Sequence, residues 1–135
     1  MTSTYLTARQ LAGLMRAGEI LAPGDADLPS FSRLGCIEHV DRILEYMGDK
    51  DLADFGSLMG VFAWLPGPVL RSILWLMTKN QSMPGSLGFN LRMLELGVKG
   101  VVMTLYYSGL SGAGFQGKSV YDIIGWDAKI CTRTE

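Results

Sequence analysis

The stretch of sequence that decides the fold is FNLRMLELGVKGVVMTLYYS, residues 89–108. Its apolar residues follow helical spacing and no proline interrupts it, so it predicts the longest helix of the chain. Gly97 and Gly100 lie inside this helix, where each costs about 1 kcal/mol relative to alanine. We therefore expect another surface to approach the helix closely at these glycines, either a second helix of the same bundle or a partner protein.

Further helices are expected on both sides of this stretch, at residues 8–18, 32–47, 51–65, 69–79 and 119–124. Thr7 is the candidate N-cap of the first and Asp51 that of the third, and Pro66-Gly67-Pro68 breaks the chain after it. The helix over 69–79 is apolar on nearly every side, which predicts burial of most of its circumference. Because no strand pattern is sustained, the sequence predicts a single all-α domain over residues 1–135, a compact bundle of about five to six helices.

Composition narrows the classes of function. The chain is 48% hydrophobic and 19% charged, with a mean hydropathy of +0.22, so part of its apolar surface is expected to be covered by something outside the chain. A net charge of −1 and the lack of a Lys/Arg cluster argue against nucleic-acid binding. The longest uncharged apolar stretch, residues 100–110, is shorter than the roughly 20 residues of a membrane span. A helix lying on a membrane surface remains compatible with the sequence.

The N-terminal segment, residues 1–10, carries no targeting signal that we recognise. It lacks a basic region, an apolar core and a twin-arginine pair. We therefore expect a cytoplasmic protein, or a periplasmic one only if an exported partner carries it.

Residues that do chemistry are few. His39 is the only histidine and follows Cys36 by three positions, so the pair would share one side of a helix and form half a metal site at most. The alternative is a buried thiol beside a partly exposed histidine. A disulfide between Cys36 and Cys131 is compatible with an oxidising compartment and disfavoured in the cytosol. The stretch GAGFQG at 112–117 is close to a dinucleotide-binding pattern, but it follows a helix rather than a strand, which favours a plain loop. We expect no catalytic residue, metal or cofactor in this chain.

Several local motifs point together to a known family. They are Val40-Asp41-Arg42-Ile43-Leu44, Arg92-x-x-x-Leu96-x-x-x-Gly100, Tyr106-Tyr107-Ser108 and Ile124-Gly125-Trp126-Asp127. In this order and rough spacing they resemble the gluconate 2-dehydrogenase subunit 3-like family, the small helical subunit of flavin-dependent dehydrogenases of the glucose-methanol-choline type. They are also similar to the helical region before the flavin domain of long-chain alcohol oxidases.

The resemblance implies a non-catalytic accessory subunit. Such a chain would bind and stabilise or mature a flavin-dependent alcohol or sugar dehydrogenase or oxidase, and FAD would be held by that flavoprotein partner. Exported members of the family usually carry a twin-arginine signal, which this sequence lacks, and no haem-binding C-x-x-C-H occurs. The alternative function is a stand-alone helical domain that binds a small apolar ligand or a membrane surface.

The partner interface is expected near the end of the longest helix and the turn after the last one, where aromatic rings alternate with glycines. Its candidate residues are Gly97, Gly100, Tyr106, Tyr107, Phe115, Tyr121 and Trp126. For the tyrosine pair, the structural reading is that one ring packs inward while the other sits at the rim. The alternative for the whole cluster is that these rings only close the end of the bundle.

Overall fold

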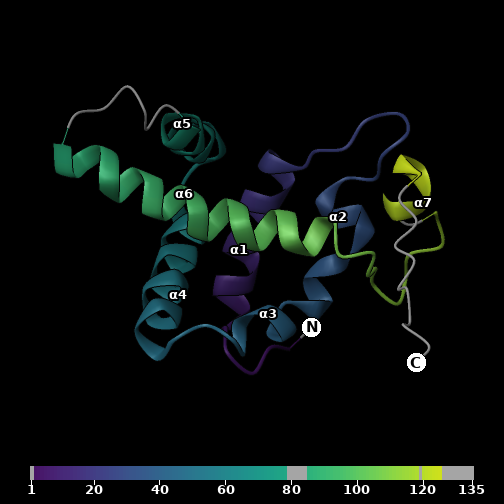
Figure 1. Cartoon of the computed structure of the whole chain (residues 1–135), viewed down its shortest axis with the longest axis horizontal. Helices are drawn as coiled ribbons and strands as arrows, with labels where there is room; N and C mark the ends of the chain where they lie inside the picture. Colours follow the sequence, from purple (N-terminus) through teal and green to yellow (C-terminus); the bar gives the residue numbers. More distant parts are fainter. Residues whose placement is uncertain (1, 79–84, 119, 126–135) are drawn as a thin grey trace, which may run out of the picture.

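The computed structural model describes residues 2–78, 85–118 and 120–125, and in these residues the chain is helical and has no strand (Figure 1). The elements are the helices α1 (Ala8–Leu21), α2 (Phe31–Leu34), α3 (Asp41–Leu44), α4 (Asp49–Trp64), α5 (Gly67–Thr78), α6 (Gly85–Tyr106) and α7 (Val120–Ile124), and the 3-10 turn η1 (Cys36–His39). The predicted all-α class is confirmed.

Helix α1 begins where the sequence places it and continues further than expected. The Thr7 hydroxyl accepts a hydrogen bond from the backbone N–H of Gln10, and the Gln10 side-chain oxygen accepts one from the backbone N–H of Thr7, so each side chain caps a backbone N–H that would otherwise be unpaired. Gly18 does not end the helix, which runs on to Leu21. At Gly18 a Cβ atom would lie 2.3 Å from the Phe31 ring. This glycine therefore makes room for a core side chain.

The single helix predicted over 32–47 is instead broken into α2, η1 and α3. Gly35 causes the break, because its φ of 70° is a left-handed conformation that ends α2. Its backbone also passes close to Gly112, whose Cα would lie 3.0 Å from a Cβ at position 35. The predicted buried face nevertheless survives the break, since Leu34, Val40 and Leu44 are all at most 1% exposed.

Helices α1 and α4 form the closest helix pair that the structure describes. A Cβ on Gly13 would lie 1.9 Å from the carbonyl oxygen of Met59, so only glycine permits this approach. The guanidinium of Arg16 donates to the carbonyl oxygens of Phe62 and Ala63, at 2.7 and 3.1 Å, and so caps the C-terminal turn of α4. The other end of α4 begins after Gly48, which shows that the predicted Asp51 N-cap is wrong: Asp51 lies in the first turn.

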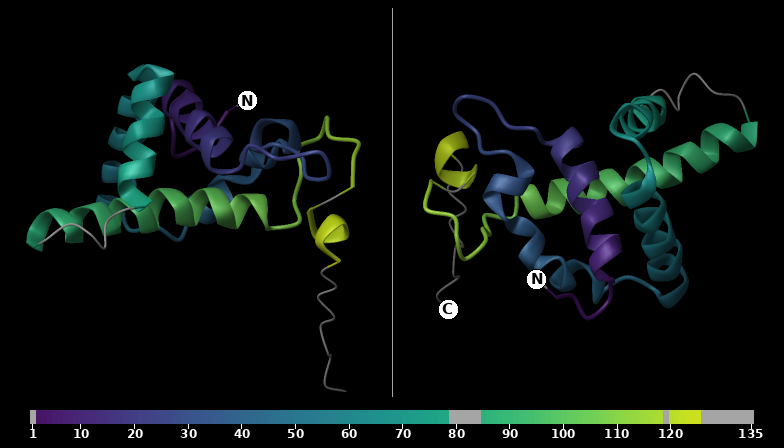
Figure 2. Two further views of the ribbon diagram at one scale, coloured as in Figure 1. Left: turned by 90° about the horizontal axis from the view of Figure 1, so that it is seen from above. Right: turned by 180° about the vertical axis from the view of Figure 1, so that it is seen from behind.

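Helix α6 lies across α1 and next to α5 (Figure 1), and α1 and α5 lie on the same side of it (Figure 2, left). Its inner face is apolar and buried, with Val98, Val102 and Leu105 at most 1% exposed. The burial gained by these side chains holds α6 against the rest of the bundle. Its other side carries no described element.

Helix α5 is not buried as predicted. Leu70, Leu74 and Met77 face the core, and their spacing places them along one stripe. On the opposite side Trp75 is 62% exposed and Val69 is 43% exposed. The apolar residues around this helix therefore belong to two surfaces, and only one of them packs inside the chain.

Candidate partner interface

Gly97 and Gly100 lie on the open side of α6. A Cβ added at either position would meet no atom of the described residues within 4 Å. The expectation that a second helix of the same bundle comes close at these glycines is therefore wrong for the part of the chain described. The other expectation, an approach by a partner protein, stays a prediction.

Part of the exposed side of α6 is apolar or made of glycine. Leu96, Gly100 and Tyr107 are separated by four and seven positions, a spacing that places them on one side of a helix. Leu96 is 62% exposed and Tyr107 is 45% exposed. We call Leu96, Gly97, Gly100 and Tyr107 the outer strip of α6. It combines two large apolar side chains with glycines that leave the helix backbone accessible between them.

The two tyrosines at the end of α6 have different surroundings. Tyr106 is 3% exposed, and its hydroxyl donates a hydrogen bond of 2.6 Å to the Pro29 carbonyl oxygen. Burial, followed by the nearby Tyr107, raises the pKa of Tyr106 above its ordinary value, so the hydroxyl remains a donor at neutral pH. The Tyr107 ring meets it edge-on, with centroids 5.0 Å apart and planes at 87°. This confirms that one ring packs inward and the other sits at the rim.

The glycine-containing loop after α6 is held by hydrogen bonds to η1 and to the end of α2. The Gly112 amide donates to the Leu34 carbonyl oxygen at 2.9 Å, and the Ala113 amide donates to the Glu38 carboxylate at 3.1 Å. A Cβ on Gly112 would lie 2.7 Å from the Glu38 carboxylate. The amides that a dinucleotide loop would turn towards a pyrophosphate are thus engaged within the chain itself.

Two other predicted interface residues lie beyond α6. Phe115 is partly buried and packs against the core. It also lines a hollow of about 250 Å³ together with Pro29, Arg33, Lys118 and Ile123. The side chain of Tyr121 and the whole of Trp126 lie outside the described part of the structure. Their predicted role at the interface stays a prediction.

The Cys36 side chain packs in the core, and the His39 side chain bonds to the loop after α6. Cys36 is fully buried, and this burial raises the pKa of its thiol to about 12. A ring nitrogen of His39, Nε2, forms a hydrogen bond of 2.9 Å with the Ser111 carbonyl oxygen. Among the described residues no three His, Cys, Asp or Glu side chains are grouped as metal ligands. Cys131 lies outside the described residues.

A second exposed apolar surface surrounds the junction of α4 and α5, and the sequence patterns did not single it out. Trp64 in the last turn of α4 is 76% exposed, and Val61 one turn earlier is also exposed. On α5, Val69, Trp75 and Leu76 are exposed as well. The signal that points to it is the apolar pattern all round α5, which predicts a covered helix without saying what covers it.

Comparisons of the chain with models of protein families, with curated proteins and with solved structures found no match. The resemblance to the small-subunit family therefore rests on the motifs quoted above. Within the residues described, no helix is long and apolar enough to cross a lipid bilayer.

Proposed function

We propose that this chain is a non-catalytic accessory subunit that binds a larger enzyme through the outer strip of α6. The observation that supports the proposal best is the strip itself, where Leu96 and Tyr107 stand exposed on either side of accessible glycines. The sequence motifs favour a flavin-dependent alcohol or sugar dehydrogenase or oxidase as the partner, with FAD held by that partner.

The glycines give the strip its value for binding. Gly97 and Gly100 cost about 1 kcal/mol each in helix stability, and nothing in the described chain uses the space beside them. A partner helix or loop that crosses at this point can approach the α6 backbone directly. Leu96 and Tyr107 then lie against the partner as anchors, and covering each of them stabilises the complex by roughly 1 to 2 kcal/mol.

The strip alone is too small for a stable complex, since specific interfaces bury roughly 800 Å² on each partner. The hollow beside Phe115 extends the interface beyond the end of α6. Pro29 lines this hollow and also accepts the Tyr106 hydrogen bond, so the hollow begins next to the tyrosine pair. Arg33 and Lys118 are exposed at the hollow together with Asp25 and Asp27, so it offers charges of both signs for choosing the correct partner surface.

Co-expression with a flavin-dependent alcohol or sugar dehydrogenase or oxidase from the same source tests the proposal. We expect the two proteins to purify as a stoichiometric complex that shows the visible absorbance of bound FAD. Replacing Gly100 with leucine (Gly100→Leu) places a bulky side chain in the open space beside α6, so it should abolish binding and leave the free subunit folded. Tyr107→Ala should weaken binding by about 2 kcal/mol, roughly thirtyfold.

A matched control is Tyr46→Ala, because Tyr46 is 85% exposed and lies between α3 and α4, outside the strip. It should leave binding unchanged. The proposal is refuted if Gly100→Leu binds the flavoprotein with unchanged affinity. A monomer that purifies alone with an extracted apolar ligand would instead support the stand-alone binding domain.

A further inference from the structure

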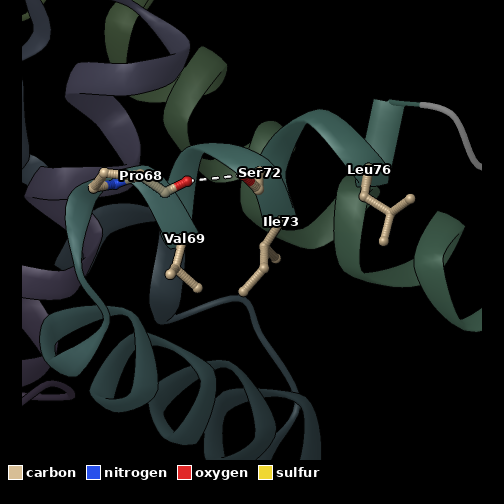
Figure 3. Close-up of a pocket in the computed structure, with 5 residues that line it drawn as sticks. All are labelled: Pro68, Val69, Ser72, Ile73 and Leu76. Atoms are coloured by element: carbon tan, nitrogen blue, oxygen red, sulfur yellow. Dashed lines mark hydrogen bonds between the residues drawn. The ribbon is translucent and has the colours of Figure 1, made fainter.

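The surface at the junction of α4 and α5 has a composition different from that of the outer strip. We call Val61, Trp64, Val69, Trp75 and Leu76 the α4–α5 elbow, and each of these side chains is at least 36% exposed. Figure 3 shows Val69, Ile73 and Leu76 projecting from one side of α5. With Pro68 and Ser72 they line an open hollow of about 320 Å³.

The elbow offers few polar groups on its α5 side. The Ser72 hydroxyl donates its hydrogen to the Pro68 carbonyl oxygen at 2.9 Å, one turn back in the same helix (Figure 3). Arg71 is the one charged residue in α5, and it is exposed. The exposed side of α5 is therefore apolar with a single cation at its edge.

The charged side chains that the described structure places at the elbow itself are cations. On α5 this is Arg71. From α1, the guanidinium carbon of Arg9 lies 5.4 Å from the centre of the Trp64 ring, which places a further cation at the elbow. The nearest acid along α4, Asp54, is about 15 Å from Trp64 at 1.5 Å per residue. This separation exceeds the Debye length of about 8 Å at physiological salt, so its repulsion of an anion at the elbow is largely screened.

We propose that the α4–α5 elbow rests on the surface of an anionic lipid bilayer. Tryptophan is the side chain most suited to the level of the lipid head groups, because its ring is apolar and its N–H is polar. Apolar side chains bordered by cations, without acids among them, match an interface with acyl chains below and phosphates above. A protein partner chosen by charge pairing would favour both signs around the contact.

This inference goes beyond the proposed function and does not depend on it, because the elbow and the outer strip share no residue. An enzyme bound at α6 would then be held near the membrane by the accessory chain. The two surfaces can be tested separately with variants of one and of the other.

Vesicle binding by the purified full chain tests the inference. Vesicles of phosphatidylcholine alone are compared with vesicles of phosphatidylcholine and phosphatidylglycerol in equal amounts, by sedimentation and by tryptophan fluorescence. We expect the chain to sediment with the anionic vesicles, its fluorescence to shift to the blue, and binding to weaken as salt is added.

Substitutions at the elbow should weaken this binding. Trp64→Ala should reduce the vesicle affinity about tenfold, since it removes an aromatic side chain from the apolar phase. Arg71→Gln should reduce the affinity for anionic vesicles about fivefold and should not change the affinity for phosphatidylcholine vesicles. Both side chains are exposed, so the helical circular dichroism of the variants should match that of the parent chain. Tyr46→Ala is the control that should bind vesicles as the parent does.

Two results would overturn the inference. One is equal or absent binding to the two kinds of vesicle. The other is unchanged binding of a Trp64→Ala, Arg71→Gln double variant that has retained its helicity. If the elbow variants bind vesicles as well as the parent does but no longer bind the flavoprotein, the elbow contacts protein and the lipid assignment is wrong.

Discussion

The same substitution, glycine to alanine, should have opposite effects at two helix positions. At Gly13 the new Cβ would lie 1.9 Å from the Met59 carbonyl oxygen and 3.0 Å from the Ala63 nitrogen, both backbone atoms of α4. Because backbone cannot turn away as a side chain can, α1 and α4 must separate, which costs about 3 kcal/mol. Alanine's better helix propensity returns about 1 kcal/mol. The net loss of stability for Gly13→Ala is about 2 kcal/mol.

At Gly100 the new Cβ meets nothing described within 4 Å, so only the gain in propensity remains. Gly100→Ala should raise the free energy of unfolding by up to about 1 kcal/mol. For a chain of 135 residues, 1 kcal/mol corresponds to about 4 °C in Tm. Thermal unfolding followed by circular dichroism should therefore give a Tm about 8 °C lower for Gly13→Ala and about 4 °C higher for Gly100→Ala. A neutral Gly13→Ala, or a destabilised Gly100→Ala, would refute the packing described for α1, α4 and α6.

Three other side chains give predictions that purified protein can test. Tyr106→Phe should destabilise the fold by about 2 kcal/mol in urea unfolding, since it leaves the buried Pro29 carbonyl without its donor. Arg16→Met should cost about 1 to 2 kcal/mol by the same measurement, because the last turn of α4 loses its cap while the aliphatic stem is kept. In a Cys131→Ser background, Cys36 should resist iodoacetamide at pH 8 until the chain is unfolded, because a buried thiol with a pKa of about 12 yields almost no thiolate. The free energy of unfolding that the protonated Cys36 thiol contributes should be complete below pH 9, the ordinary pKa of a cysteine thiol. It should decline as the pH rises towards 12, because the thiol of the unfolded chain loses its proton first.

The helical class and the capped start of α1 could be read from the sequence because both depend on local chemistry. Thr7 and Gln10 are three positions apart and satisfy each other's backbone wherever the rest of the chain lies. The break at Gly35 could not be read in this way. A glycine inside an apolar helical pattern is tolerated in many helices, and here the close passage of Gly112, far along the chain, accompanies the left-handed turn.

The candidate interface was predicted in part, and its limits have a physical cause. Sequence identifies Gly97 and Gly100 as costly in a helix, but it does not tell whether the space beside them is filled from within the chain or from outside. The glycine that does admit another helix is Gly13, whose sequence surroundings in α1 are unremarkable. For α5 the apolar pattern indicated burial, and the structure shows that the chain itself covers one side of that helix alone.

The contacts that close the bundle carry a consequence for its synthesis. The bonds from Tyr106 to Pro29, from Ala113 to Glu38 and between His39 and Ser111 join residues 77, 75 and 72 positions apart. Helix α4 ends at Trp64, so α1 and α4 emerge from the ribosome, and can pair, before these later partners emerge. At roughly 5 to 20 residues per second, the later partners follow several seconds afterwards. Throughout that interval the nascent chain displays the apolar residues that α6 will cover, and it is then that a chaperone would find it most readily.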